Sequence, residues 1–239
     1  MASSYKRILL KVSGEALAGD NSFGIEPPFL QAVARQIADV ARTGIQVAIV
    51  VGGGNIFRGM AGAADGTDRV TADLMGMLGT MINALALSNA ISRQGVKSKP
   101  FSAATMPSVA DTFTARDAKQ ALEEGFVVVL GGGTGNPFFT TDTAATLRAI
   151  ELECDVVLKG TKVDGVYSDD PKKNPDATRY TQIGYDEVIA RNLKVMDTAA
   201  FALARDSNMP IIVYALDEPA GLSGVLEGRG MSTWVGEPK

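Results

Sequence analysis

The sequence predicts an α/β protein with a parallel sheet that is covered by helices on both faces. Apolar runs rich in valine and isoleucine recur along the chain, and most are followed by a glycine-containing loop and a helical pattern. The runs at residues 45–51 (IQVAIVV) and 126–130 (FVVVL) are almost continuously apolar, as is typical of parallel strands buried on both sides. Because such strands end at one edge of the sheet, the loops that leave them are expected to form a shared binding site.

The predicted elements alternate along the chain. Strands are expected at residues 5–12, 45–51, 96–102, 126–130, 155–159, 211–215 and 232–235. Helices are expected at residues 29–42, 67–94, 115–124, 143–153, 185–192, 197–207 and 219–226. We interpret residues 18–28 as a loop and the polar residues 168–178 as a surface excursion. No repeat or linker interrupts the pattern, so a single domain over residues 1–239 is expected, with a change of role near residue 160.

The composition narrows the classes of function. The 239 residues carry a net charge of −4 and no basic run, which argues against a nucleic-acid groove. No histidine is present, which excludes histidine triads, histidine zinc sites and histidine general bases. The single cysteine, Cys154, fits a reducing compartment and is interpreted as a small buried side chain. With no signal peptide and no apolar run approaching the length of a membrane span, we expect a cytoplasmic protein.

The stretch at residues 131–142, GGGTGNPFFTTD, is the main candidate for a binding site. It follows an apolar strand and precedes a helix, an arrangement that presents backbone N–H groups to an anion. Its threonine hydroxyls, Asn136, the aromatic pair Phe138–Phe139 and Asp142 suit a phosphorylated ligand that carries a ring. The alternative is a glycine-rich turn that binds nothing.

Lysines and a second glycine loop are expected at the same edge. Lys11 interrupts an apolar strand and precedes a serine-glycine turn, where a phosphate could approach the backbone; the alternative is an edge-strand lysine that faces solvent. Lys159 ends a later strand. Residues 52–59 (GGGNIFRG) supply a backbone anion nest and Arg58. These groups are typical of phosphoryl transfer, although the P-loop and protein-kinase signatures are absent.

Several other residues have purely structural interpretations. Asp73 is placed in the first turn of the long helix, where the helix dipole favours a carboxylate. Asp197 is interpreted as a helix N-cap in preference to a catalytic residue. The methionines of the long helix, Met75, Met77 and Met81, are interpreted as core or subunit contacts.

Four motifs, LLKVSGEAL, GGGNIFRG, TGNPFFTTDTAA and DVVLKGTKVDGVYSDDP, resemble those of the bacterial uridylate kinases, members of the amino-acid kinase superfamily. The resemblance extends over essentially the whole chain and includes KVMDTAAFALARD. It implies a three-layer αβα sandwich with a mainly parallel central sheet, assembled as a homohexamer. It also implies UMP kinase activity, the reversible transfer of the ATP γ-phosphoryl group to UMP to give UDP and ADP. This reaction serves the synthesis of UTP and CTP, and Mg²⁺ is expected mainly through the ATP phosphates.

The resemblance implies roles for individual residues. Catalytic roles are implied for Lys11, Arg58, Asp142 and Lys159. ATP binding is implied for Lys11, Val12, Ser13, Gly14, Gly54, Arg58, Thr161, Tyr167 and Asp170. UMP binding is implied for Gly53, Asp73, Thr134, Gly135, Asn136, Pro137, Phe138, Phe139, Thr140 and Thr141. Residues 1–159 would then form mainly the UMP and phosphate side, and residues 160–239 mainly the ATP side.

The resemblance also implies GTP as an activator and UTP as an inhibitor. The loop at residues 18–24 occupies the place of the family's GTP-linked loop. The basic residues that such relatives carry near residues 88–99 are matched only by Arg93 and Lys99, which argues against activation by GTP.

Other functions compete with this interpretation. A related kinase could phosphorylate a carboxylate or a carbamate, but the TGNPFFTTD loop argues against it. A nucleotide-binding regulator without activity is disfavoured by the presence of Lys11, Asp142 and Lys159. A dinucleotide oxidoreductase is disfavoured because Phe57 stands where the G-x-G-x-x-G fingerprint needs its last glycine. No nucleic acid or membrane partner is expected.

Overall fold

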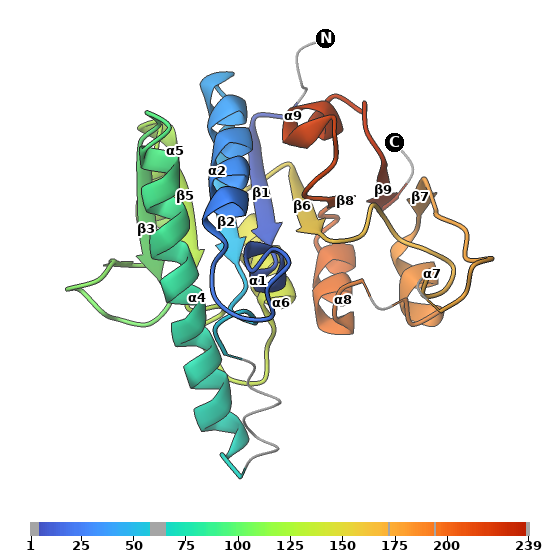
Figure 1. Cartoon of the computed structure of the whole chain (residues 1–239), viewed down its shortest axis with the longest axis horizontal. Coiled ribbons are helices and arrows are strands. Elements are labelled where there is room, and N and C mark those ends of the chain that lie inside the picture. Colours follow the sequence, from blue (N-terminus) through green and yellow to red (C-terminus); the bar gives the residue numbers. More distant parts are fainter. Residues whose placement is uncertain (1–4, 58–65, 172, 194, 238–239) are drawn as a thin grey trace.

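A mainly parallel sheet runs through the middle of the molecule (Figure 1). The structure is a computed structural model that describes residues 5–57, 66–171, 173–193 and 195–237. Over these ranges the sheet contains nine strands in the order β4-β3-β5-β2-β1-β6-β8-β9-β7. The strands are β1 (Arg7–Val12), β2 (Gln46–Val51), β3 (Ser98–Ser102), β4 (Asp111–Thr112), β5 (Val127–Gly131), β6 (Val156–Thr161), β7 (Gln182–Ile183), β8 (Ile211–Ala215) and β9 (Ser232–Val235). Neighbouring strands pair in parallel except β8 and β9, which are antiparallel.

Helices cover both faces of this sheet. They are α1 (Gly14–Leu17), α2 (Pro27–Arg42), α4 (Arg69–Ser92), α5 (Ala115–Glu123), α6 (Thr141–Glu151), α7 (Tyr185–Ala190), α8 (Thr198–Asp206) and α9 (Gly221–Leu226). Buried side chains of α1, α2, α4 and α9 form one hydrophobic cluster with the sheet, and those of α5, α6, α7 and α8 form another. The predicted αβα sandwich with a mainly parallel sheet is therefore confirmed.

The central strands explain why the sequence reads as continuous apolar runs. Every residue of β1 is buried, and its side chains alternate between the two faces. Ile8 and Leu10 belong to the cluster under α2, whereas Leu9 belongs to the cluster under α6. Lys11 follows the same alternation, so it lies on the α6 face of the sheet.

Two helices begin two residues before their predicted starts, for local reasons. α2 begins at Pro27 instead of Phe29, because prolines are accepted in a first helical turn, where the backbone N–H has no intrahelical partner. α6 begins at Thr141 instead of Thr143, because the Thr140 side chain caps it by accepting a hydrogen bond from the Asp142 backbone N–H at 3.0 Å. Asp142 therefore lies in the first turn of a helix.

Other elements escaped the sequence pattern because they are very short. α1 has four residues, and β4 and β7 have two each. The β4 strand is defined by pairing with β3 and the β7 strand by pairing with β9. Strand β6 extends two residues past its predicted end at residue 159 and finishes at Thr161.

Helix α4 corrects two predictions. Its N-cap is Asp68, whose side chain accepts from the Thr71 N–H at 3.0 Å, so Asp73 lies in the second turn and gains little from the helix dipole. Its 24 residues also reach the length and hydropathy of a membrane span, contrary to expectation, although half of the apolar window is buried in the protein. The N-terminal half of α4 extends past the carboxyl ends of the strands (Figure 1).

Candidate active site

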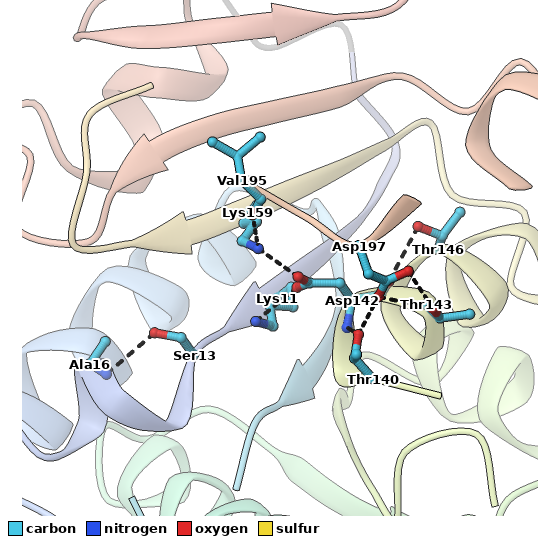
Figure 2. Close-up of polar contacts among 10 residues, drawn as sticks. All are labelled: Lys11, Ser13, Ala16, Thr140, Asp142, Thr143, Thr146, Lys159, Val195 and Asp197. Carbon is cyan, nitrogen blue, oxygen red and sulfur yellow. Dashed lines mark hydrogen bonds and ion pairs between the residues drawn. The ribbon is translucent and has the colours of Figure 1, made fainter. Parts of the chain in front are cut away.

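Two buried lysines share one carboxylate at the carboxyl ends of β1 and β6. The Lys159 Nζ atom donates to Asp142 Oδ2 at 2.6 Å, and the Lys11 Nζ atom lies 2.8 Å from Oδ1 (Figure 2). The Lys11 contact has the distance of an ion pair without hydrogen-bond alignment. Lys159 also donates to the Val195 carbonyl oxygen. The structure thus brings together three of the residues predicted to be catalytic, and Lys11 does not face solvent.

The charges of this cluster control each other's ionisation. Burial favours the neutral form of Asp142, but the ammonium groups of Lys11 and Lys159 outweigh burial and hold the pKa of Asp142 below its ordinary value. Burial also lowers the pKa of Lys159, and Asp142 opposes that shift only in part. Two ammonium groups and one carboxylate leave one net positive charge, which suits an incoming anion.

The first turn of α6 is hydrogen-bonded to a segment that lies more than 50 residues later in the chain. Thr140 donates its hydroxyl proton to Asp197, and Thr143 donates to the same carboxylate at 2.9 Å (Figure 2). Asp197 also caps α8 by accepting from the Ala200 N–H at 2.8 Å, which confirms it as an N-cap. Its second role, as the anchor of the two threonines, was not foreseen, because residues 140 and 197 are adjacent only in the folded chain.

The loops that follow β1 and β2 lie in direct backbone contact. A Cβ atom at Gly14 would approach the Gly54 nitrogen to 2.8 Å, so only glycine fits. The Ser13 hydroxyl accepts from the Ala16 N–H at 3.3 Å and so caps α1. The two predicted phosphate loops therefore form one continuous backbone surface beside Lys11.

A cavity of about 260 Å³ lies next to this surface, and we call it the α4 cavity. The predicted residues that line it are Gly53, Gly54, Asp73, Thr134, Asn136, Phe139, Thr140 and Thr141. Gly54, expected on the ATP side, lies here together with Gly53. Gly135, Pro137 and Phe138 are not among the lining residues, although the Phe138 N–H donates to Asp73 Oδ2 at 2.8 Å.

Further residues line the α4 cavity to which the sequence analysis assigned no individual binding role. They are Phe57, Arg69, Gly76, Met77, Thr80 and Gly133. Four of these lie on α4 at positions −4, +3, +4 and +7 from Asp73, so helical spacing from that aspartate would have found them. Arg69 donates to Asp73 Oδ2 at 2.8 Å, and Oδ1 has no hydrogen-bond partner among the described residues.

A second cavity, of about 510 Å³, contains Tyr167 and Asp170, and we call it the Tyr167 cavity. Its other lining residues include Asp169, Lys173, Arg191, Asn192 and Val195. Thr161 ends β6 and is not among the lining residues. The predicted residue Arg58 lies outside the described residues.

The lysine cluster lines neither cavity itself but is connected to one lining residue of each. Thr141, which precedes Asp142, lines the α4 cavity, and Val195, which accepts from Lys159, lines the Tyr167 cavity. A site with buried positive charge between two cavities can bring two anionic ligands together and cancel their repulsion.

Known proteins resemble this chain over nearly its whole length. The sequence model of the Amino acid kinase family matches residues 6–215. The chain is 52% identical over 233 residues to a uridylate kinase of Roseobacter denitrificans, covering 98% of this chain and 96% of that protein. Among solved structures, it is similar to a UMP kinase of Bacillus anthracis, with a TM-score of 0.94, 38% identity, and coverage of 98% and 97% of the two chains. A UMP kinase of Ureaplasma parvum gives a TM-score of 0.92, 39% identity, and coverage of 97% and 99%. The chain therefore belongs to the amino acid kinase family.

Proposed function

We propose that this protein is a UMP kinase, which transfers the γ-phosphoryl group of ATP to UMP and yields UDP and ADP. The observation that carries the proposal is the pair of buried lysines on one carboxylate between two cavities. Its relatives of near full-length similarity are uridylate and UMP kinases. The reaction is reversible and would supply UDP for UTP and CTP synthesis.

The acceptor in this reaction is already an anion. A phosphate oxygen of UMP attacks the γ-phosphorus, the bond from that phosphorus to the ADP oxygen breaks, and ADP leaves with the bond electrons. Little deprotonation is needed, so a chain without histidine can catalyse the step. What the site must do is hold the two phosphates in line and neutralise their charge.

The chain's own residues would divide this task. Lys11 would contact the transferring group and Lys159 the neighbouring phosphate oxygens, while Asp142 keeps both ammonium groups in place. Arg58 would add a second clamp. Mg²⁺ would enter as Mg-ATP, held mainly by the ATP phosphates, and would supply further positive charge. This arrangement requires no metal ligand from Asp142, because its carboxylate already faces two ammonium groups.

We assign the α4 cavity to UMP and the Tyr167 cavity to the adenosine of ATP. All residues that line the α4 cavity fall between 53 and 141, and those of the Tyr167 cavity fall between 163 and 195. This supports one domain with residues 1–159 mainly on the UMP side and 160–239 mainly on the ATP side. In this assignment Asp73 Oδ1 would accept from the UMP ribose, and Val12, Ser13, Gly14 and Thr161 would lie along the ATP phosphates and adenosine.

Assembly and regulation are proposed from family resemblance. We propose a homohexamer in the cytoplasm. Apolar residues exposed along α4 support a subunit contact there; they are Val70, Leu74, Leu78 and Ile82, which are 41–54% exposed in the single chain. UTP would inhibit. GTP would activate weakly at most, because Lys99 is already paired with Asp111 at 2.7 Å in a hollow that also contains Asp117 and Glu124. Light scattering tests the oligomeric state. Titration of UTP or GTP into an assay of UDP formation tests inhibition and activation.

One assay tests the central proposal. Purified protein is incubated with UMP and Mg-ATP, and UDP is measured directly. CMP, dCMP, aspartate, glutamate and carbamate serve as alternative acceptors. UDP formation with little turnover of the others is expected. Phosphorylation of a carboxylate or a carbamate instead, or binding of UMP and ATP without UDP, would overturn the proposal.

A further inference from the structure

Three buried polar side chains interrupt the apolar face of α4, namely Thr80, Asn83 and Ser88, and the first two contact the glycine loops. Thr80 is 3% exposed and Asn83 is fully buried, among apolar neighbours such as Met81, Ala84 and Leu87. A buried hydroxyl or amide destabilises a protein unless it is hydrogen-bonded. The hydrogen-bond partners of these two side chains therefore indicate their structural role.

Asn83 holds the glycine loop that follows β2. Its Nδ2 atom donates to the Gly52 carbonyl oxygen at 2.7 Å and to Asn55 Oδ1 at 2.6 Å. Asn55 returns a hydrogen bond to Asn83 Oδ1 at 3.1 Å and donates to the Gly24 carbonyl at 2.7 Å. The two amides thus form a reciprocal pair that fixes both ends of the Gly52–Asn55 loop to α4.

Thr80 holds the other glycine loop, the one that follows β5. Its Oγ1 atom accepts from the Gly132 N–H at 2.7 Å and donates to the Met77 carbonyl oxygen at 2.6 Å. Thr80 and Asn83 are three residues apart, so both side chains project from one face of the helix. One turn of α4 therefore sets the positions of both loops.

Both loops contribute lining residues to the α4 cavity. Gly53 and Gly133 line it from the two loops, and Thr80 lines it from the helix between them. The wall at Gly53 touches α4 directly, because a Cβ atom there would lie 2.8 Å from the Gly76 carbonyl oxygen and 2.9 Å from the Thr80 nitrogen. A small shift of either loop would change the width of the cavity.

We propose that Thr80 and Asn83 are positioning residues that set the width of the acceptor cavity. The inference rests on the proposed function, because it takes the α4 cavity as the UMP site. Both act through the loops, since the Thr80 hydroxyl proton and the Asn83 amide protons are used in bonds within the protein. Their loss displaces the acceptor relative to the phosphate of ATP, while the Tyr167 cavity, which neither residue lines, is unchanged.

The test compares Thr80→Val and Asn83→Leu with two matched controls on the same helix, Thr71→Val and Asn89→Leu, whose side chains are exposed. In both buried variants the KM for UMP should rise and kcat should fall, giving a loss of roughly 10- to 100-fold in kcat/KM for UMP. The KM for ATP should stay within about twofold. The control variants should match the unmodified protein.

Hydrogen exchange provides a readout that does not depend on the substrate. Backbone amides of residues 52–56 and 131–136 should exchange faster in the buried variants, while α4 itself remains protected. Thr80→Val has nearly the same shape as the native side chain, so it decides the matter if Asn83→Leu does not fold.

Two results would overturn the inference. One is an unchanged KM for UMP together with unchanged exchange in both loops. The other is an equal loss toward UMP and ATP that follows a lower melting temperature, as a merely structural role predicts. Absence of UDP formation by the unmodified protein would overturn the proposed function instead, and the exchange measurement would still decide whether the two loops depend on α4.

Discussion

Lys11 and Lys159 are register partners on the neighbouring parallel strands β1 and β6. Side chains of register partners project from the same face of a sheet, so both ammonium groups reach the Asp142 carboxylate at the start of α6. Both lysines are less than 10% exposed. The sheet itself therefore fixes the spacing of the two positive charges.

Replacing Lys11 tests the contact with the transferring group. Lys11→Ala should lower kcat by about 100- to 1,000-fold, as loss of a preorganised charge at a reacting group does, with a much smaller rise in the KM for UMP. Steady-state UDP formation at varied UMP measures both constants. Lys6→Ala, at an exposed position next to the same strand, is the control. A raised KM with kcat intact would contradict the catalytic role.

Neighbouring residues on α6 should have separable effects. Thr141 lines the α4 cavity, whereas Asp142 faces the lysines. Thr141→Ala should therefore mainly raise the KM for UMP, by about tenfold for one lost hydrogen bond to a charged group. Asp142→Asn should mainly lower kcat. Kinetics at varied UMP and varied Mg-ATP distinguish the two, and similar behaviour of both variants would show that this division is wrong.

The pKa of Lys159 predicts how activity depends on pH. Burial first, and then the nearby Lys11, lower this pKa below the ordinary lysine value of 10.5. As the pH rises through the lowered pKa, Lys159 loses its charge and kcat should fall. The substrate phosphates do not cause this decline, because they are already fully ionised well above about pH 6. In Lys159→Arg the guanidinium stays charged, so kcat should be lower overall but flat over the same alkaline range. An unchanged alkaline decline in that variant would assign the titration to another group.

The lowered pKa of Asp142 predicts a loss of stability in acid. A carboxyl whose folded-state pKa is below its ordinary value, 3.8, stabilises the fold above that value and loses the contribution as the pH falls through the folded-state pKa. Asp142→Asn leaves two buried ammonium groups without a counter-charge, so at about pH 7 it should unfold more easily by about 3 kcal/mol. The difference from the unmodified protein should narrow on acidification below the ordinary pKa.

Urea unfolding followed by the fluorescence of Trp234, the single tryptophan, measures this difference at each pH. Asp39→Asn, which affects an exposed ion pair with Arg42, is the control and should change stability by less than about 1 kcal/mol. A difference that stays constant from neutral to acid pH would mean that Asp142 is not held ionised by the lysines.

Much of the fold could be predicted from local pattern. The valine-rich runs marked the long strands, and the helix predicted at residues 115–124 matches α5 to within one residue. Errors occurred where a side chain or a neighbouring strand sets the boundary. Thr140 moved the start of α6, and β4 exists because Asp111 pairs with Phe101.

The sequence by itself determined the chemistry that is available: two lysines after apolar strand residues, an aspartate after a threonine-rich loop, and glycines at strand ends. Only the tertiary structure decided how these groups meet. Lys11 and Lys159 become neighbours through strand pairing, and Thr140 reaches Asp197 through the packing of α6 beside α8. The bonds from Thr80 and Asn83 to the two glycine loops were likewise hidden, because in the sequence both residues lie within an apolar helix. Such contacts join residues that are far apart along the chain, so no local periodicity encodes them.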